Sequence, residues 1–161
     1  MASTHSEPDR TDGVPGAALM RLSDVVTVVF AVAAVTSAVA LDHLNVLIVV
    51  VSLVLFVAGC VAFLWAYAIA VGRSRTDAIG IGGLFFLEGS APRRVQVRLL
   101  GALAIQVVVA VGTAAAHPFT SQAFAVLVPM FGLGVAGLWG ARHGRFAARS
   151  EVAPPVEQIR D

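Results

Sequence analysis

Apolar residues gather in four long runs, separated by shorter segments that are rich in polar residues, glycine and arginine. A helix that crosses a membrane needs about 20 consecutive, mostly apolar residues. Four segments meet this requirement: residues 22–41, 44–71, 97–116 and 120–139. The second run is longer than a hydrocarbon core of ~30 Å needs at ~1.5 Å per residue, so we expect it to tilt or to project beyond the core. The pattern predicts an all-α fold, a four-helix transmembrane bundle built from two helical hairpins.

The composition supports a membrane protein and argues against a soluble domain. Of the 161 residues, 58% are hydrophobic and 13% are charged, and the mean hydropathy is +0.86. A soluble domain of this size carries about 25% charged residues. The net charge of +1 gives no sign of a nucleic-acid partner. The single cysteine, Cys60, allows neither an intramolecular disulfide nor a cysteine-based metal site.

The links between the apolar runs predict the topology. Residues 42–45 and 117–120 are short and contain no arginine, as expected for turns within antiparallel hairpins. The arginines fall in residues 72–96, in both tails, or just inside a span at Arg98, and therefore all lie toward one side. The positive-inside rule makes that side cytoplasmic. We expect a multi-pass protein of a bacterial plasma membrane with both termini in the cytoplasm.

Polar tails and interfacial aromatic residues complete this topology. Residues 1–21 form a polar tail that we expect to be disordered, and residues 140–161 begin as a basic stretch and end in a second disordered tail. Trp65, Tyr67 and Trp139 lie near the predicted cytoplasmic ends, where amphipathic rings anchor helices at the interface.

Small residues recur on every predicted span, and helices in lipid associate through the close approach that such residues allow. The residues expected to pack are Ala58, Ala62, Ala66, Ala70, Ala102, Gln106, Ala110, Ala114, Gly132, Ala136 and Gly140. Internal packing of one bundle is the favoured interpretation, and binding of a partner subunit or a second copy is the alternative. Gln106 is expected to form a hydrogen bond with Ser52, Thr36 or Ser37.

A few residues are expected to shape the ends and bends of helices. Ser23 or Asp24 is a candidate N-cap of the first span. Ser90 resembles an N-cap of the third span, with Pro92 in its first turn. Pro129 lies inside the fourth span, where it removes a backbone hydrogen bond and should kink the helix.

The central segment, residues 72–96, links the second and third apolar runs. Residues 84–87 read LFFL, a run that is costly in water yet too short to cross a membrane, which is typical of interfacial or re-entrant segments. Gly80, Gly82 and Gly83 disfavour a stable helix before it. Arg93, Arg94 and Arg98 would form a basic collar at the membrane surface. This collar, with Phe85 and Phe86, is the predicted contact site for anionic phospholipid headgroups or for a partner protein.

Candidate chemistry is sparse. No Asp, Glu, Lys or Arg falls within the apolar part of a span, so no proton or ion relay is evident. Asp42, His43 and His117 lie in the outer turns, but their spacing does not demand a metal ion. The GIGG sequence at residues 80–83 lacks the lysine and hydroxyl residues of a phosphate-binding loop. The sequence therefore predicts neither a metal nor another cofactor, and it predicts no enzymatic activity.

Two stretches carry a resemblance to a known group. The sequences GGLFFLEGSAP (residues 82–92) and HPFTSQAFAVLVPMFGLGVAGLWGARHG (residues 117–144) resemble small integral membrane proteins of actinobacteria that have no assigned activity. The resemblance covers roughly the second half of the chain. It implies a plasma-membrane protein of an actinobacterium and implies no mechanism.

Three functional hypotheses follow, in decreasing order of support from the sequence. The favoured one is a non-enzymatic accessory or scaffold subunit of a membrane complex. The second is a small transporter or flippase for an apolar or lipid-linked substrate, which would use the Pro129 kink and the basic collar. The third is a lipid-modifying enzyme that uses Asp77, Glu88 and the arginines of the central segment.

Overall fold

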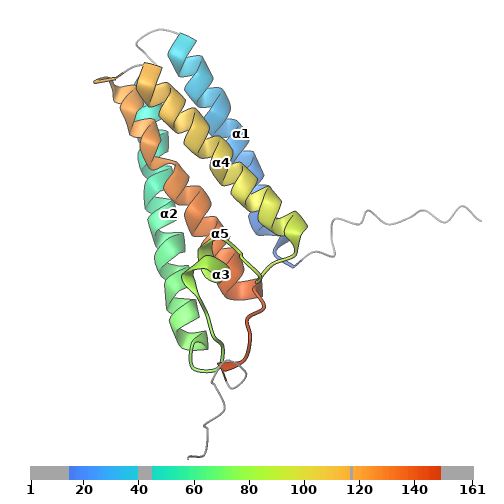
Figure 1. The fold of residues 1–161 in the computed structure, drawn as a ribbon. Coiled ribbons are helices and arrows are strands. Elements are labelled where there is room, and N and C mark those ends of the chain that lie inside the picture. The colour runs from blue at the N-terminus through green and yellow to red at the C-terminus, as the bar shows by residue number, and fades with distance from the viewer. Residues whose placement is uncertain (1–14, 40–44, 117, 150–161) are drawn as a thin grey trace, which may run out of the picture.

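The computed structural model describes residues 15–39, 45–116 and 118–149, and within this part it is a four-helix bundle (Figure 1). The elements in chain order are α1 (Ala17–Val39), α2 (Asn45–Arg73), α3 (Ile81–Phe85), α4 (Arg93–Ala116), the 3₁₀ helix η2 (Ser121–Leu127) and α5 (Pro129–His143). Four stretches are long and apolar enough to cross a membrane: Ala17–Ser37, Val46–Arg73, Arg93–Ala116 and Ser121–His143. The chain is therefore a multi-pass membrane protein, and the predicted all-α bundle is confirmed.

Helix α1 begins five residues before the predicted start of the first span. Gly16, with a φ of 76°, makes the turn that precedes the helix. Ser23 is fully buried inside the helix and Asp24 follows it, so neither residue caps α1, contrary to the prediction. Residues 17–21 and 140–143 of the predicted tails belong to α1 and α5. Residues 1–14 and 150–161 of those tails, and the turn residues Asp42, His43 and His117, lie outside the described residues.

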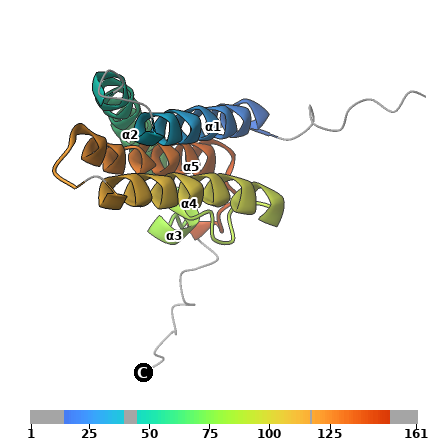
Figure 2. The ribbon, with the colours of Figure 1, turned by 90° about the horizontal axis from the view of Figure 1, so that it is seen from above.

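Helix α5 is the centre of the bundle. Its span has 56% of its residues buried, against 17–28% for the other three spans. It packs most extensively on α2 and also contacts α4, α3 and α1, and Figure 2 shows α4 and α5 side by side. Helices α1 and α2 are consecutive, yet α1 packs mainly on α4. The packing units thus differ from the sequence hairpins.

The contact between α2 and α5 is made by glycines on both helices. A Cβ atom built on Gly59 would lie 2.5 Å from the backbone of Met130 and Phe131, so the two backbones touch. A Cβ atom on Gly134 would collide with the carbonyl of Gly59. Further along the pair, Ala66 is fully buried and lies near Gly137.

The alanine stripe predicted on α2 is only partly in this contact. Ala66 and Ala70 are buried and Ala62 is partly buried, but Ala58 is exposed and Gly59 takes its place. A stripe at four-residue spacing drifts by about 40° per step around a helix of 3.6 residues per turn, which carries Ala58 off the interface. On α4 and α5, Ala102, Gln106, Ala110, Gly132, Ala136 and Gly140 are buried as predicted, and Ala114 is half-buried.

Pro129 does not lie in the interior of an α-helix. It occupies the first turn of α5, directly after η2 and Val128, and Val128 has helical dihedral angles (φ −63°, ψ −37°). A proline at the start of a helix leaves no intrahelical hydrogen bond unmade. Pro129 therefore does not interrupt an α-helix, contrary to the prediction. Instead, the fourth span changes from a 3₁₀ helix to an α-helix just before the proline.

Apolar side chains face outward and polar ones face inward, as a bundle in lipid requires. Val25, Val28 and Val32 of α1 are each about 60% exposed. Thr27 and Gln106 are buried, and the Nε2 of Gln106 donates to Thr27 Oγ1 at 2.7 Å. The partner of Gln106 is thus Thr27 rather than Ser52, Thr36 or Ser37.

Candidate functional site

One end of the bundle holds most of its charged residues, and we call it the Arg-rich end. It comprises the beginnings of α1 and α4, the ends of α2 and α5, and the segments 74–92 and 144–149. The two segments are joined by backbone hydrogen bonds. Ala78 N donates to Ala147 O, Arg149 N to Thr76 O, and Arg145 N to Ser90 O, each at 2.9 Å. The described part of the predicted C-terminal tail is therefore bound to the central segment.

Arg73 connects α2 to the end of α5. Its guanidinium forms an ion pair with Asp77 at 2.9 Å and donates to Ala141 O at 2.8 Å and to Gly144 O at 3.3 Å. The same group lies 5.4 Å from the centre of the Phe146 ring. A buried helix end needs partners for its last carbonyl groups, and Arg73 supplies them from another helix. The sequence alone assigned no such role to Arg73 or Asp77.

The apolar run at residues 84–87 packs into the bundle and is not a separate segment on the membrane surface. Leu84, Phe85 and Leu87 are at most 6% exposed, whereas Phe86 is 52% exposed. Phe85 stacks on Phe63 of α2, with 4.5 Å between ring centroids. Leu87 has a φ of 58°, an unfavourable value for a leucine, and this turn directs its side chain back into the core.

The short helix α3 contradicts the prediction that the glycines would prevent a helix there. Gly82 and Gly83 lie within it. Leu84 and Phe85 pack where Gly140 and Gly137 of α5 leave room for them, so tertiary contacts outweigh the low helix propensity of glycine. Ser90 does not cap α4, contrary to the prediction. Its hydroxyl donates to Gly83 O at 2.5 Å and so links the residue to the short helix α3.

The predicted basic collar is divided in the structure. Arg93 and Arg94 are exposed at the start of α4. Arg98 is engaged with Asp24 of α1, and its Nε donates to the carboxylate at 2.7 Å. Arg98 therefore joins α1 to α4 rather than forming one site with the other two arginines.

Trp139 also differs from its predicted place at the interface. It is 2% exposed, and its indole Nε1 donates to Pro15 O at 3.0 Å, which fixes the turn before α1. Trp65 and Tyr67 are each 57% exposed on the outside of α2, as expected for residues that face lipid or its interface.

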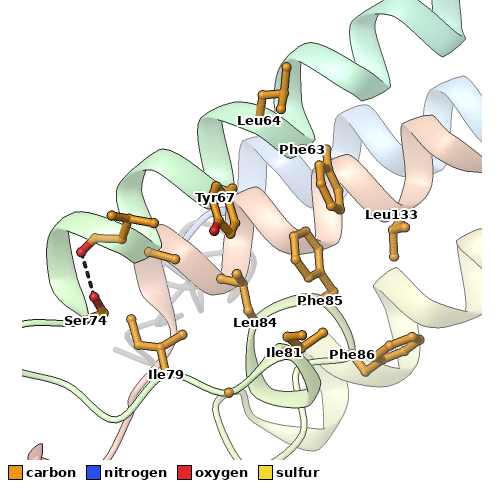
Figure 3. A pocket seen from close by; sticks show the side chains of 13 residues that line it. Phe63, Leu64, Tyr67, Ser74, Ile79, Ile81, Leu84, Phe85, Phe86 and Leu133 are labelled. Carbon is orange, nitrogen blue, oxygen red and sulfur yellow. Dashed lines mark hydrogen bonds between the residues drawn. The ribbon is translucent and has the colours of Figure 1, made fainter.

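A long apolar groove lies beside the Arg-rich end, between α2 and the α3 segment (Figure 3). Its volume is about 550 Å³. The residues that line it are Phe63, Leu64, Tyr67, Ala70, Val71 and Ser74 of α2, Ile79, Gly80, Ile81, Leu84, Phe85 and Phe86 of the central segment, and Leu133 of α5. Both predicted phenylalanines thus line this apolar groove, and Phe86 O also accepts a hydrogen bond from Gln96 Nε2 of α4 at 3.0 Å.

A second surface lies on the outside of α4. Gly101, Ala104, Val108, Gly112 and Ala115 follow one another at three- or four-residue spacing, and we call them the outer stripe. Ala104, Val108 and Gly112 are exposed, and a Cβ atom on Gly101 or Gly112 would meet no atom within 4 Å. The buried face of α4 carries Ala102, Gln106 and Ala110, so this helix has small residues on two faces.

Several residues with structural roles were not singled out in the sequence, among them Arg73 at the Arg-rich end and Gly59 and Thr27 inside the bundle. Gly59 and Thr27 carried a signal, because glycines and hydroxyl side chains within spans often make helix–helix contacts. Among the described residues, no three His, Cys, Asp or Glu side chains form a group that could hold a metal ion.

Comparison with known proteins gives no match: neither a protein-family model, nor a curated protein, nor a solved structure is similar to this chain. The fold and surfaces described above define its class, a polytopic membrane protein with a four-helix bundle.

Proposed function

We propose that this protein is a non-enzymatic accessory or scaffold subunit of a larger membrane complex, and that it binds a transmembrane helix of its partner through the outer stripe of α4. The observation that carries this proposal is that Ala104, Val108 and Gly112 are exposed and that a Cβ atom on Gly101 or Gly112 would meet no atom within 4 Å. In lipid, small residues at three- or four-residue spacing allow two helix backbones to approach closely. In the described part of the chain Ala104, Val108 and Gly112 are exposed, whereas Gly59 of α2 and Gly134 of α5 are buried against each other.

The charged residues support a structural role over catalysis. Asp77 and Asp24, two of the acidic residues in the described part, are held by Arg73 and Arg98. These pairs join helices to one another and to the central segment. We therefore rank the lipid-modifying enzyme, with Asp77 in a catalytic role, below the scaffold.

The alternative of a transporter or flippase rests on the apolar groove. The residues of α2 that line the groove begin at Phe63, and the stacked rings of Phe63 and Phe85 stand at that end (Figure 3). The groove thus runs beside the half of α2 nearest the Arg-rich end. A cavity in one half of the membrane suits binding better than passage, and the scaffold is the better-supported function.

We place the protein in the plasma membrane of an actinobacterium, with the Arg-rich end in the cytoplasm. Nine arginines but only three acidic residues occur in the described part of the chain, and the arginines lie at or near this end. The assignment to an actinobacterium rests on the resemblance stated for residues 82–92 and 117–144 alone.

The test is purification of the tagged full-length protein in a mild detergent, followed by mass spectrometry of whatever remains bound. We expect a stoichiometric membrane-protein partner with wild type, and its loss with Ala104→Leu or Gly112→Leu. Ala58→Leu is the matched control, because Ala58 is equally exposed but lies on α2. Isolation of a monomer without a partner, or equal retention of the partner by Ala104→Leu and Ala58→Leu, would contradict the proposal.

A further inference from the structure

The apolar groove beside α2 has dimensions that identify the kind of molecule that fits it. Its lining extends along α2 from Phe63 to Ser74, which is about 17 Å at 1.5 Å per residue. One leaflet of a hydrocarbon core is about 15 Å thick. The groove therefore runs from the Arg-rich end through roughly one leaflet.

The length of the groove favours a lipid chain over a protein helix. The groove accompanies α2 only from Phe63 to Ser74, whereas α2 itself has 29 residues. A transmembrane helix packed on α2 would continue along it through both leaflets, but a single acyl chain ends within one leaflet.

The surroundings of the groove favour the same occupant. Leu64, Tyr67 and Val71 form one wall and are more than half exposed, so the groove opens sideways to the bilayer. Ser74 marks the end of the groove nearest the polar boundary, and its hydroxyl donates to Val71 O at 2.8 Å (Figure 3). Arg75 follows it, is exposed, and forms no ion pair within the described part of the chain.

We infer that the apolar groove binds one acyl chain of an anionic phospholipid from the leaflet at the Arg-rich end, with the headgroup phosphate at Arg75. A chain that moves from bulk lipid into the groove gains little from the hydrophobic effect, because both surroundings are apolar. Selection therefore depends on the headgroup, and one arginine near the surface favours an anionic lipid about fivefold. The site differs from the collar of Arg93, Arg94 and Arg98, and the inference does not depend on the proposed scaffold function.

The experiment is native mass spectrometry of the full-length protein in detergent with added phosphatidylglycerol or phosphatidylcholine of the same acyl chains. We expect one phosphatidylglycerol to be retained by wild type. Val71→Trp and Leu64→Trp fill the groove from its exposed wall and should reduce retention at least tenfold. Val61→Trp, at an exposed position of α2 outside the groove, should retain the lipid as wild type does.

A second pair of variants tests the headgroup. Arg75→Gln should lose the preference for phosphatidylglycerol about fivefold while phosphatidylcholine binding is unchanged, and Arg94→Gln should keep the preference. Inorganic phosphate at the same concentration should not displace the lipid. Equal retention by Val71→Trp, Leu64→Trp and Val61→Trp would overturn the inference. So would a photoreactive residue at position 64 that cross-links to a polypeptide instead of a lipid.

Discussion

Replacing Gly59 by alanine should push α2 away from α5 and destabilise the bundle. The added Cβ atom would lie 2.5 Å from Met130 C and Phe131 N, and ordinary contact begins at 3.4 Å. Both atoms belong to the backbone of α5, so no side-chain rotation can relieve the collision. The helices must separate locally by about 0.9 Å, the difference between those two distances.

The expected cost follows from the contacts that this separation weakens. A gap of 0.5–1 Å forfeits about a quarter to a half of each atom–atom attraction of ~0.1–0.2 kcal/mol. If the separation affects as many atom pairs as one buried leucine makes, about 40–60, the loss lies between about 1 and 6 kcal/mol, with a middle value of about 3 kcal/mol. The higher helix propensity of alanine returns about 0.5–1 kcal/mol. We expect Gly59→Ala to lower the free energy of unfolding by about 1–3 kcal/mol, the range of overpacked cores.

Gly112→Ala is the matched control, because a Cβ atom at Gly112 would meet nothing within 4 Å. It should leave stability unchanged or raise it by up to ~1 kcal/mol. The assay is reversible unfolding in mixed micelles with increasing sodium dodecyl sulfate, followed by the fluorescence of the buried Trp139. Equal stabilities of the two variants, within ~0.5 kcal/mol, would refute the close contact. Gly134→Ala tests the same contact from α5, and since one separation accommodates both, its combination with Gly59→Ala should cost less than the sum.

The remaining predictions concern polar contacts and use the same unfolding assay. Arg73→Met removes charged hydrogen bonds to the end of α5 and should lower the free energy of unfolding by about 2–3 kcal/mol. We also expect faster proteolysis after residue 143, and unchanged proteolysis would contradict this role. Thr27→Val leaves the amide of Gln106 without its partner and should cost about 1–2 kcal/mol. Adding Gln106→Leu should restore most of that loss, and a further decrease would refute the pairing. Arg98→Gln should cost under ~1 kcal/mol, because its pair with Asp24 is partly exposed; a loss above ~2 kcal/mol would show a stronger pair.

The number and extent of the spans follow from the sequence because length and apolar composition determine them directly. The four predicted runs each fall largely within an observed span, and differences are concentrated at the ends. The start of α1 depends on the backbone turn at Gly16 and on the Trp139 hydrogen bond from the far end of the chain. Local patterns such as the candidate cap at Ser23 could not reveal a contact between residues more than a hundred positions apart.

The Arg-rich end could not be derived from the sequence for a similar reason. The collar grouped Arg93, Arg94 and Arg98 because they are close in the chain, but Arg98 is paired with Asp24 of another helix. The segment at residues 84–87 looked interfacial because its length is too short for a span. Its burial depends on space that Gly137 and Gly140 leave on α5, and that space exists only once the helices have packed.

The face that a helix turns toward the bundle interior can be predicted from its polar residues as well as from its small residues. In lipid both faces of α4 are apolar, so hydrophobicity does not say which face is inside. An amide in hydrocarbon is costly unless it is hydrogen-bonded, so Gln106 must point inward, as it does. At about 100° per residue, Gly101, Ala104 and Gly112 then lie about 120–160° away from Gln106, on the outside. The outer stripe thus faces outward because Gln106 faces inward. Its residues Ala104, Val108 and Gly112 are exposed in the described part of the chain, which is the reason to look for a helix that packs on them.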